Sequence, residues 1–297
     1  MKTKRILALL LAMAMTFALA SCGTAGTSGS GSAAKDETAS AEGAAASQPS
    51  GDKTELIVFA AASMTETLNE LKAKYEAANP DITITCNFDS SGTLKTQIQE
   101  GAPCDLFISA AQLQMDQMDA KDTTGSNTEK LDLVRSDSRI DLLENKVVLV
   151  VPKDNPKKIK TFDQLAEQLK AGKVLMAMGN SDVPVGQYTQ RILAYYKLNE
   201  KELADKGCIT YGTNVKEVTT QVSEGSVDCG VVYATDAYSA GLEAMDTATS
   251  EMCGEAIYPA AVLKNSKNPE AAQAFLDYLT GDEAMAVFEG VGFNRVG

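Results

Sequence analysis

The sequence predicts an α/β protein, and three observations lead to this class. Short apolar runs rich in β-branched residues alternate with helical patterns from residue 54 to the end of the chain, which is typical of a sheet with parallel strands and flanking helices. A hydrophobic content of 44% over 297 residues is sufficient to bury a core in one or two domains. Several predicted strands end in Ser, Ala or Gly, as in GAPCDLFISAA at residues 101–111, so these ends carry no reactive side chain.

The elements follow one another in a regular order. The helix after the first strand has four apolar residues at helical spacing, from Met64 to Tyr75, and ends before Pro80. A polar, irregular stretch at 122–140 is expected to be a loop. Strands are expected at 55–61, 81–88, 105–109, 146–152, 173–179, 228–235 and 257–263. Helices are expected at 63–80, 93–101, 110–121, 161–172, 183–198, 215–225, 269–281 and 282–293.

The N-terminus predicts an export signal. A basic start, MKTKR, precedes an apolar run at residues 6–20, which is too short for a normal spanning helix and fits a signal peptide. The run ends in LASC, which resembles the bacterial lipobox, so residues 1–21 are expected to be removed and Cys22 to be lipidated. An ordinary signal peptide cut nearby is the alternative. Residues 22–52 are mostly small and polar and are expected to form a flexible, lipid-anchored linker.

The composition excludes several classes of function. The net charge is −13, and removal of residues 1–21, which hold three basic residues and no acid, makes it −16; such a chain repels nucleic acid. Histidine is absent, which removes the most common general base and metal ligand. A secreted serine hydrolase using Ser63 or Ser91 would need a base, yet neither a GxSxG elbow nor an SxxK pattern accompanies these serines. We therefore expect no enzyme and no cofactor.

The cysteines beyond Cys22 predict no zinc site, because they have no CxxC spacing and no histidine partner. Most of them lie in apolar runs, so buried thiols are expected, and their odd number prevents complete pairing. A disulfide between Cys208 and Cys229 remains open. The five residues are Cys86, Cys104, Cys208, Cys229 and Cys253.

Two serines are candidates for binding an anion. Ser63 and Ser91 each follow a predicted strand and open a helix, whose N-terminus offers free N–H donors and a partial positive charge. The alternative for Ser63 is a capping box with Glu66, in which the hydroxyl bonds only its own helix. Ser91 has the parallel alternative of a plain N-cap. The local sequence leaves both interpretations open.

Two further helix starts lie in the second half of the chain. Pro184 suits the first helical position and leaves the amide of Val185 free, while Asn214 is expected to cap the helix that begins at Val215. Val185 as an ordinary core residue is the alternative. Because ligands of open α/β sheets bind outside the carboxyl ends of strands, all four helix starts are placed to face one ligand.

These motifs, taken in order, resemble the molybdate-binding proteins of ABC importers. The resemblance rests on VFAAASMTETL, FDSSGTLKTQI, GAPCDLFISAA, NSDVPVGQY and GVVYATDA and covers residues 54–297. It implies a type II periplasmic-binding-protein fold with two lobes, each a central mixed sheet flanked by helices, and a ligand cleft between them. The lobes are expected at 53–144 plus 236–297 and at 145–235. Closure on the ligand is expected to hinge near 141–147 and 233–237.

The same resemblance implies the contacts to the ligand. Ser63 and Ser91 would donate from hydroxyl and amide groups, and Val185 and Val215 from backbone N–H groups. Tyr233 would donate from its phenol, against the alternative of a buried aromatic whose hydroxyl is satisfied elsewhere. These contacts would surround a tetrahedral oxyanion.

Two positions depart from the family pattern. Asp89 stands where a small uncharged residue is usual, and its carboxylate would weaken anion binding if it faced the cleft. Gly92 stands where a third serine is common, which removes a donor. Ala110 and Ala111 are small, so the backbone there can come close to the anion or to the other lobe.

The resemblance implies an extracytoplasmic solute-binding protein. It would capture molybdate, and also tungstate, and deliver it to the membrane permease of an ABC importer, as a monomer held by lipidated Cys22 on the outer face of the cytoplasmic membrane. The only metal expected is the one within the oxyanion, and no site that binds a cation directly is expected. A binder of sulfate or another tetrahedral oxyanion is the main alternative, and an inert surface lipoprotein is a further one.

Overall fold

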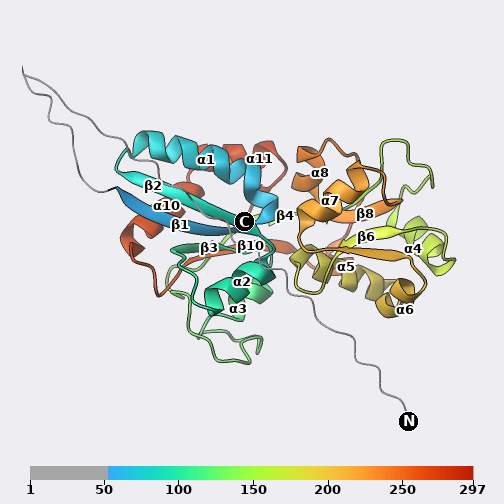
Figure 1. Cartoon of the computed structure of the whole chain (residues 1–297), viewed down its shortest axis with the longest axis horizontal. Helices are drawn as coiled ribbons and strands as arrows, with labels where there is room; N and C mark the ends of the chain where they lie inside the picture. Colours follow the sequence, from blue (N-terminus) through green and yellow to red (C-terminus); the bar gives the residue numbers. More distant parts are fainter. Residues whose placement is uncertain (1–52, 297) are drawn as a thin grey trace, which may run out of the picture. The chain divides into compact units, whose positions relative to one another are not determined.

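The computed structural model describes residues 53–296, whose strands form two separate sheets (Figure 1). The predicted signal segment 1–21, the predicted lipid-attachment residue Cys22 and the predicted linker 22–52 lie outside the described residues. Within the described part, no helix combines the length and the apolar character that crossing a membrane requires.

The first sheet has six strands in the order β11-β4-β10-β3-β1-β2. Strand β1 is parallel to β2 and β3, whereas β10 is antiparallel to β3 and β4. The predicted mixed sheet is therefore confirmed for this half of the molecule. Its strands are β1 (Thr54–Ala61), β2 (Ile82–Asp89), β3 (Leu106–Ile108), β4 (Ile140–Asn145), β10 (Ala256–Val262) and β11 (Asn294–Arg295).

The second sheet has five strands in the order β7-β6-β8-β5-β9. Strand β6 is parallel to β7 and β8, and β5 is antiparallel to β8 and β9, so this sheet is mixed as well. Its strands are β5 (Val147–Val150), β6 (Met176–Gly179), β7 (Ile209–Gly212), β8 (Cys229–Tyr233) and β9 (Ala244–Thr247).

Helices flank both sheets, with α1 and α11 on one side of the first sheet and α2 and α3 on the other (Figure 1). The apolar spacing predicted from Met64 to Tyr75 is confirmed, since all four of its residues are buried. In the first half the helices are α1 (Thr65–Ala78), α2 (Ser91–Gln99), α3 (Gln112–Asp116), α10 (Pro269–Thr280) and α11 (Asp282–Gly290). In the second they are α4 (Phe162–Lys170), α5 (Pro184–Tyr195), α6 (Glu200–Asp205), α7 (Val215–Ser223), α8 (Ala234–Ser239) and α9 (Ser250–Cys253).

The chain passes between the two sheets twice. It leaves the first sheet after β4, at Lys146, and returns between the end of α9 and the start of β10, where Gly254 has a φ of 79°. We call residues 53–145 and 256–296 the first lobe and residues 147–253 the second lobe. The expected boundary at 236 would place β9 in the first lobe, but β9 pairs with β5. The second crossing is therefore at 254–255 rather than at 233–237.

Other differences concern short elements. The helix expected at 110–121 is only the five-residue α3, because a series of turns follows it. Strand β8 ends at Tyr233, where α8 begins directly. The sequence analysis did not predict β4, β7, β9 and β11, which have six residues or fewer, or the short helices α6, α8 and α9. The polar loop expected at 122–140 is confirmed up to Arg139 as turns and one isolated bridge at Val134.

The cysteines are free thiols in the described part of the chain. Four of the five are buried, as expected, whereas Cys86 is half-buried. Burial raises the pKa of the Cys86 and Cys253 thiols to about 11. Cys208 and Cys229 do not form the disulfide that the sequence left open.

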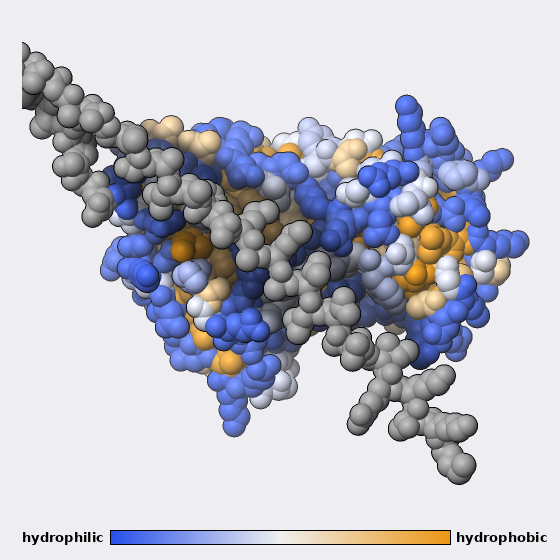
Figure 2. Space-filling view, in the orientation of Figure 1, coloured by the Kyte–Doolittle hydropathy of each residue, from blue (hydrophilic) through white to orange (hydrophobic). Residues whose placement is uncertain are grey.

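The hydrophobic side chains are mostly inside, and the visible face is mainly hydrophilic with scattered apolar patches (Figure 2). The largest group of buried side chains runs through both lobes and includes residues from both sheets, such as Leu56 and Val231. A second, smaller group lies under α2 and α3 and includes Phe107 and Met115. Burial of aliphatic side chains at about 25 cal/mol per Å² of apolar surface is the main force that holds such lobes together.

Candidate ligand-binding site

A small cavity lies between the two lobes and is lined from both of them. All five residues proposed from the sequence as ligand contacts line it. A larger groove on the second lobe runs past Lys153 and Met245. The cavity between the lobes is lined, besides Ser63, Ser91, Val185, Val215 and Tyr233, by Ala61, Ala62, Asp89, Ser90, Ala110, Val183 and Pro184.

Ser63 lies in a 3₁₀ turn rather than at the cap of the helix. The turn Ala62–Met64 follows β1, and α1 starts only at Thr65 with no side chain capping it. The alternative of a capping box with Glu66 is therefore excluded, because the extra turn moves the helix start beyond the serine. The Ser63 hydroxyl is buried and lies 2.9 Å from the hydroxyl of Tyr258.

Ser91 is the first residue of α2, and its neighbour Ser90 is the N-cap. The Ser90 hydroxyl accepts a hydrogen bond from the amide of Thr93, so the plain N-cap interpretation does not apply to Ser91. The Ser91 hydroxyl instead accepts a hydrogen bond of 2.9 Å from the amide of Ala110. Since an oxygen that accepts one hydrogen bond keeps its own proton, Ser91 can still donate into the cavity.

The second lobe contributes helix N-termini to the cavity. Pro184 is the first residue of α5 and Val185 the second, and Val215 is the first residue of α7. The predicted cap is confirmed, because the Asn214 side chain accepts from the amide of Glu217. Amides in the first turn have no partner within their helix. Val185 and Val215 are fully buried or nearly so, and each places such an amide beside the cavity.

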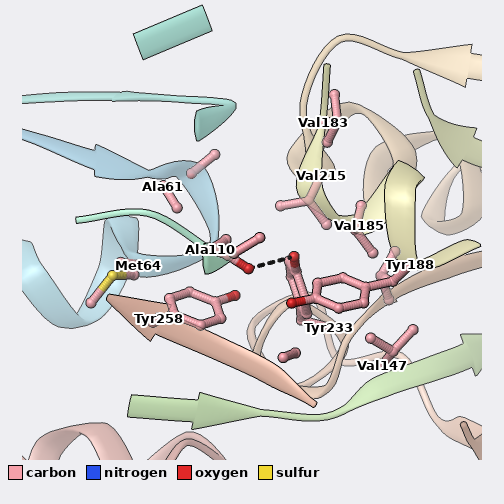
Figure 3. Close-up of a cluster of buried hydrophobic side chains, with 14 of the residues drawn as sticks. Ala61, Met64, Ala110, Val147, Val183, Val185, Tyr188, Val215, Tyr233 and Tyr258 are labelled. Atoms are coloured by element: carbon pink, nitrogen blue, oxygen red, sulfur yellow. Dashed lines mark hydrogen bonds between the residues drawn. The ribbon is translucent and has the colours of Figure 1, made fainter. Parts of the chain in front are cut away.

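Tyr233 is the last residue of β8 and is buried. Its hydroxyl donates to the carbonyl oxygen of Ala110 across the cavity, at 3.3 Å (Figure 3). Burial raises the pKa of this phenol well above its ordinary value, so it keeps its proton at neutral pH. Its ring packs edge to face between the rings of Tyr188 and Tyr258, with centroid distances of 6.3 and 5.6 Å.

Gly92, next to Ser91, lies directly against the second lobe. A Cβ at this position would lie 2.2 Å from the carbonyl oxygen of Asp182 in the second lobe. No real Cβ atom approaches an oxygen so closely, so this arrangement of the lobes requires glycine. The departure from the family pattern at Gly92 thus has a steric reason, which the sequence analysis missed.

Asp89 lines the cavity. This is the position in which its carboxylate was expected to weaken the binding of an anion. Its Oδ1 atom accepts from the amide of Ser90 at 2.7 Å and from the side chain of Asn214 in the other lobe at 3.5 Å. The carboxylate therefore has two donors of its own, which partly satisfy its charge.

A second polar contact joins the lobes. Lys216 of α7 forms an ion pair with Glu66 of α1 at 2.8 Å and lies 3.4 Å from the carboxylate of Asp236. Asp236 is fully buried and has no hydrogen-bond partner within the described residues. Burial raises the pKa of Asp236 to about 7, although Lys216 opposes this shift.

Several residues next to the cavity were not found from the sequence. Tyr258 contacts Ser63, Asn145 contacts Tyr258, and Lys216 lies beside Asp236. Tyr258 lies within a predicted strand, IYPAAVL, and no local signal separated it from an ordinary core aromatic. A search for buried polar residues near the predicted crossings would have favoured Asn145, which ends β4.

Two mixed sheets lie on either side of a small cavity, and the chain crosses between them twice. This arrangement defines the class of periplasmic binding proteins with type II topology. The periplasmic molybdate-binding protein of Azotobacter vinelandii has this fold, with a TM-score of 0.67 and 21% identity over 82% of this chain and 100% of that one. A model of the bacterial extracellular solute-binding proteins matches residues 56–294. The chain belongs to this family.

Relatives at higher identity have more specific names. A protein of Bacillus subtilis (strain 168) is 37% identical over 81% of this chain and 86% of its own length, and is provisionally named an ABC transporter substrate-binding lipoprotein, YvgL. The molybdate-binding protein ModA of Haemophilus influenzae is 32% identical over 80% of this chain and 89% of its own. The family resemblance expected from the sequence is therefore confirmed.

Proposed function

We propose that this protein is the solute-binding component of an ABC importer and binds molybdate, and also tungstate, in the cavity between its lobes. The observation that carries the proposal is that five residues predicted from distant parts of the sequence line one cavity. The name of the Haemophilus influenzae relative, a molybdate-binding protein, supports the choice of ligand.

The chemistry of the cavity fits a fully deprotonated tetrahedral dianion. Ser63 and Ser91 supply O–H groups, and the first turns of α5 and α7 supply N–H groups and the positive ends of their helix dipoles. Tyr233 would join these donors by turning its O–H group from the carbonyl oxygen of Ala110 to the ligand. Among the described residues, no lysine or arginine lines this cavity. The dianion would thus be held by neutral dipoles, in the way that helix N-termini bind phosphate groups.

The same donors determine which anions are refused. Phosphate carries at least one proton at neutral pH, and a P–OH group that faces only donors stays unpaired, which costs about 1 to 3 kcal/mol. Sulfate carries no proton but is smaller, so donors placed for a larger tetrahedron cannot all reach it without moving helix ends. Asp89 carries the one carboxylate among the described residues that line the cavity, and it could accept such a proton.

The remaining parts of the proposal follow from the sequence. The protein would act as a monomer without a cofactor, direct cation site or catalysis, and would deliver its ligand to a membrane permease. It would be anchored through Cys22 to the outer face of the cytoplasmic membrane. Cys22→Ser should abolish lipid labelling and release the protein from membranes, and unchanged labelling of this variant would contradict the anchor.

The ligand is tested by thermal unfolding of the purified protein with molybdate, tungstate, sulfate and phosphate, followed by calorimetry. A ligand present at 100 times its dissociation constant stabilises the folded state by about 2.7 kcal/mol. We expect molybdate and tungstate to bind alike, sulfate far more weakly and phosphate not detectably. Sulfate binding as tight as molybdate binding would identify a sulfate protein instead. Tight phosphate binding that is lost in Asp89→Asn would show that Asp89 acts as an acceptor.

A further inference from the structure

A chain of hydrogen bonds leads from the first crossing between the lobes to the hydroxyl of Ser63. The side-chain nitrogen of Asn145, at the end of β4, lies 3.2 Å from the hydroxyl of Tyr258, and this hydroxyl lies 2.9 Å from that of Ser63. All three residues are buried. The same nitrogen donates to the hydroxyl of Thr235 in α8, at 2.9 Å.

The orientation of Asn145 fixes the direction of the whole chain. Its Oδ1 atom accepts from the amide of Lys146 at 2.8 Å, so its nitrogen, which can only donate, faces Tyr258. The Tyr258 oxygen therefore accepts from Asn145 and directs its own proton to Ser63. Burial raises the pKa of Tyr258 well above its ordinary value, so this phenol stays protonated.

This direction determines how the hydroxyl of Ser63 bonds. Its oxygen accepts the proton of Tyr258, and its own proton remains for the cavity that it lines. Ser91 is in the same situation, since its oxygen accepts from the amide of Ala110. A serine hydroxyl can in principle turn to accept or to donate, but here each oxygen already has a donor.

We infer that Tyr258, itself oriented by Asn145, is a positioning residue that locks Ser63 as a donor and so sets the preference of the site for oxyanions without a proton. This inference rests on the proposed function of the cavity as an oxyanion site. A protonated oxyanion needs an acceptor, and Ser63 would become one if its partner stopped donating to it. The selectivity would then reside partly outside the set of residues that touch the ligand.

The experiment compares molybdate with arsenate, a tetrahedral oxyanion of similar size that keeps at least one proton at neutral pH. Calorimetry on the purified protein gives the ratio of the two affinities. In Tyr258→Phe, Ser63 loses its donor and can turn to accept, so we expect the preference for molybdate over arsenate to fall roughly tenfold. Tyr188→Phe is the matched control, because this buried phenol donates to the carbonyl of Glu255 instead.

A second variant reverses the chain without touching the tyrosine. In Asn145→Asp the donor facing Tyr258 becomes an acceptor, so Tyr258 turns its proton away from Ser63 and the serine proton moves toward Tyr258. We expect this variant to bind arsenate better relative to molybdate than the unmodified protein does. In a Ser63→Ala background, neither change should alter the ratio further.

The outcomes separate the two proposals. If the unmodified protein binds none of the tested oxyanions, the proposed function is wrong. If it binds molybdate and the ratio in Tyr258→Phe equals that in the unmodified protein and in Tyr188→Phe, the inference about Tyr258 is wrong. If Tyr258→Phe lowers thermal stability, Asn145→Asp and the ratio of affinities still test the inference, since lost stability alone does not change selectivity.

Discussion

The two lobes meet the cavity with different chemistry. The first lobe presents the hydroxyl groups of Ser63 and Ser91, whereas the second presents the helix starts at Val185 and Val215, whose side chains are apolar. A backbone amide at a helix start points in a direction fixed by the helix. A hydroxyl rotates, and in the first lobe each one is held by a neighbouring donor. The first lobe therefore needs neighbouring residues that orient its hydroxyl donors, whereas the amide donors of the second lobe are oriented by their helices.

The two lobes also carry different charges where they meet. The first lobe carries the acids Glu66 and Asp89, and the second carries Lys216 above the buried Asp236. Contact between the lobes thus pairs opposite charges. Beneath Lys216, however, the second lobe buries a carboxylate with no hydrogen-bond partner in the described part of the chain, which gives it a sensitivity to pH.

The largest expected effect concerns this buried acid. The unfolded chain releases the Asp236 proton near pH 3.8, whereas burial keeps the proton in the folded state up to about pH 7. In this window the unfolded state binds fewer protons, so the contribution of Asp236 to stability is complete below pH 3.8 and is lost as the pH rises to 7. From pH 4 to pH 8, the free energy of unfolding of Asp236→Asn should rise relative to that of the unmodified protein by up to about 4 kcal/mol. Urea unfolding at both pH values measures this, and a pH-independent difference would contradict it.

The next effect separates the hydroxyl half from the amide half. Ser63→Ala and Ser91→Ala should each weaken molybdate binding by about 1.5 to 3 kcal/mol, the value of a hydrogen bond to a charged acceptor. Val185→Ala and Val215→Ala keep their amides, so they should lower folding stability through lost buried methyl groups and leave affinity nearly unchanged. Calorimetry and urea unfolding of the four variants test the contrast. Intact affinity in both serine variants would mean that the serines have only a structural role.

A comparable effect tests the fit between the lobes. Gly92→Ala places a Cβ against the carbonyl oxygen of Asp182, and such overpacking costs about 1 to 3 kcal/mol. Because the contact exists only when the lobes are together, we expect weaker binding and a less compact protein in small-angle scattering with molybdate. Gly290→Ala, where a Cβ meets no atom within 4 Å, is the control. Closure and affinity like those of the unmodified protein would show that the lobes can meet in another way.

The smallest effect concerns the ion pair between Glu66 and Lys216. Glu66→Gln removes the charge that Lys216 meets across the lobes, and exposed pairs contribute about 0.2 to 1 kcal/mol. Molybdate affinity should fall slightly at low salt and not at high salt, because salt screens exposed charges. Glu70→Gln, which breaks a pair with Lys74 inside α1, should leave affinity unchanged. An equal loss in both variants would exclude a role in closure.

The local part of the site could be predicted from the sequence, because helix starts carry local signals. Asn214 and Pro184 mark their helices by residue type, and the structure has both at the expected positions. The same reasoning failed at Ser63, where a 3₁₀ turn that no capping rule includes comes before the helix. The resemblance to a known family then brought these turns together in one site, which local signals alone do not do.

The long-range part could not be predicted from local patterns. Ser63 and Tyr258 are 195 residues apart in the chain, and no local pattern relates them. The second crossing was misplaced for a similar reason. Strand β9 has only four residues, none of them fully buried, and it belongs to the second lobe because it pairs with β5 rather than because of its own composition.

The series of aromatic rings beside the cavity has an optical consequence. Tyr188, Tyr233, Tyr258 and Phe293 follow one another edge to face, with centroids 5.2 to 6.3 Å apart, and the chain contains no tryptophan. The ultraviolet emission of the protein therefore comes from tyrosine, without the energy transfer to indole that hides it in most proteins. The three tyrosine rings are close enough to exchange excitation, so a change in hydrogen bonding at Tyr233 is expected to alter their shared emission. An unlabelled sample thus carries its own fluorescent reporter beside the cavity.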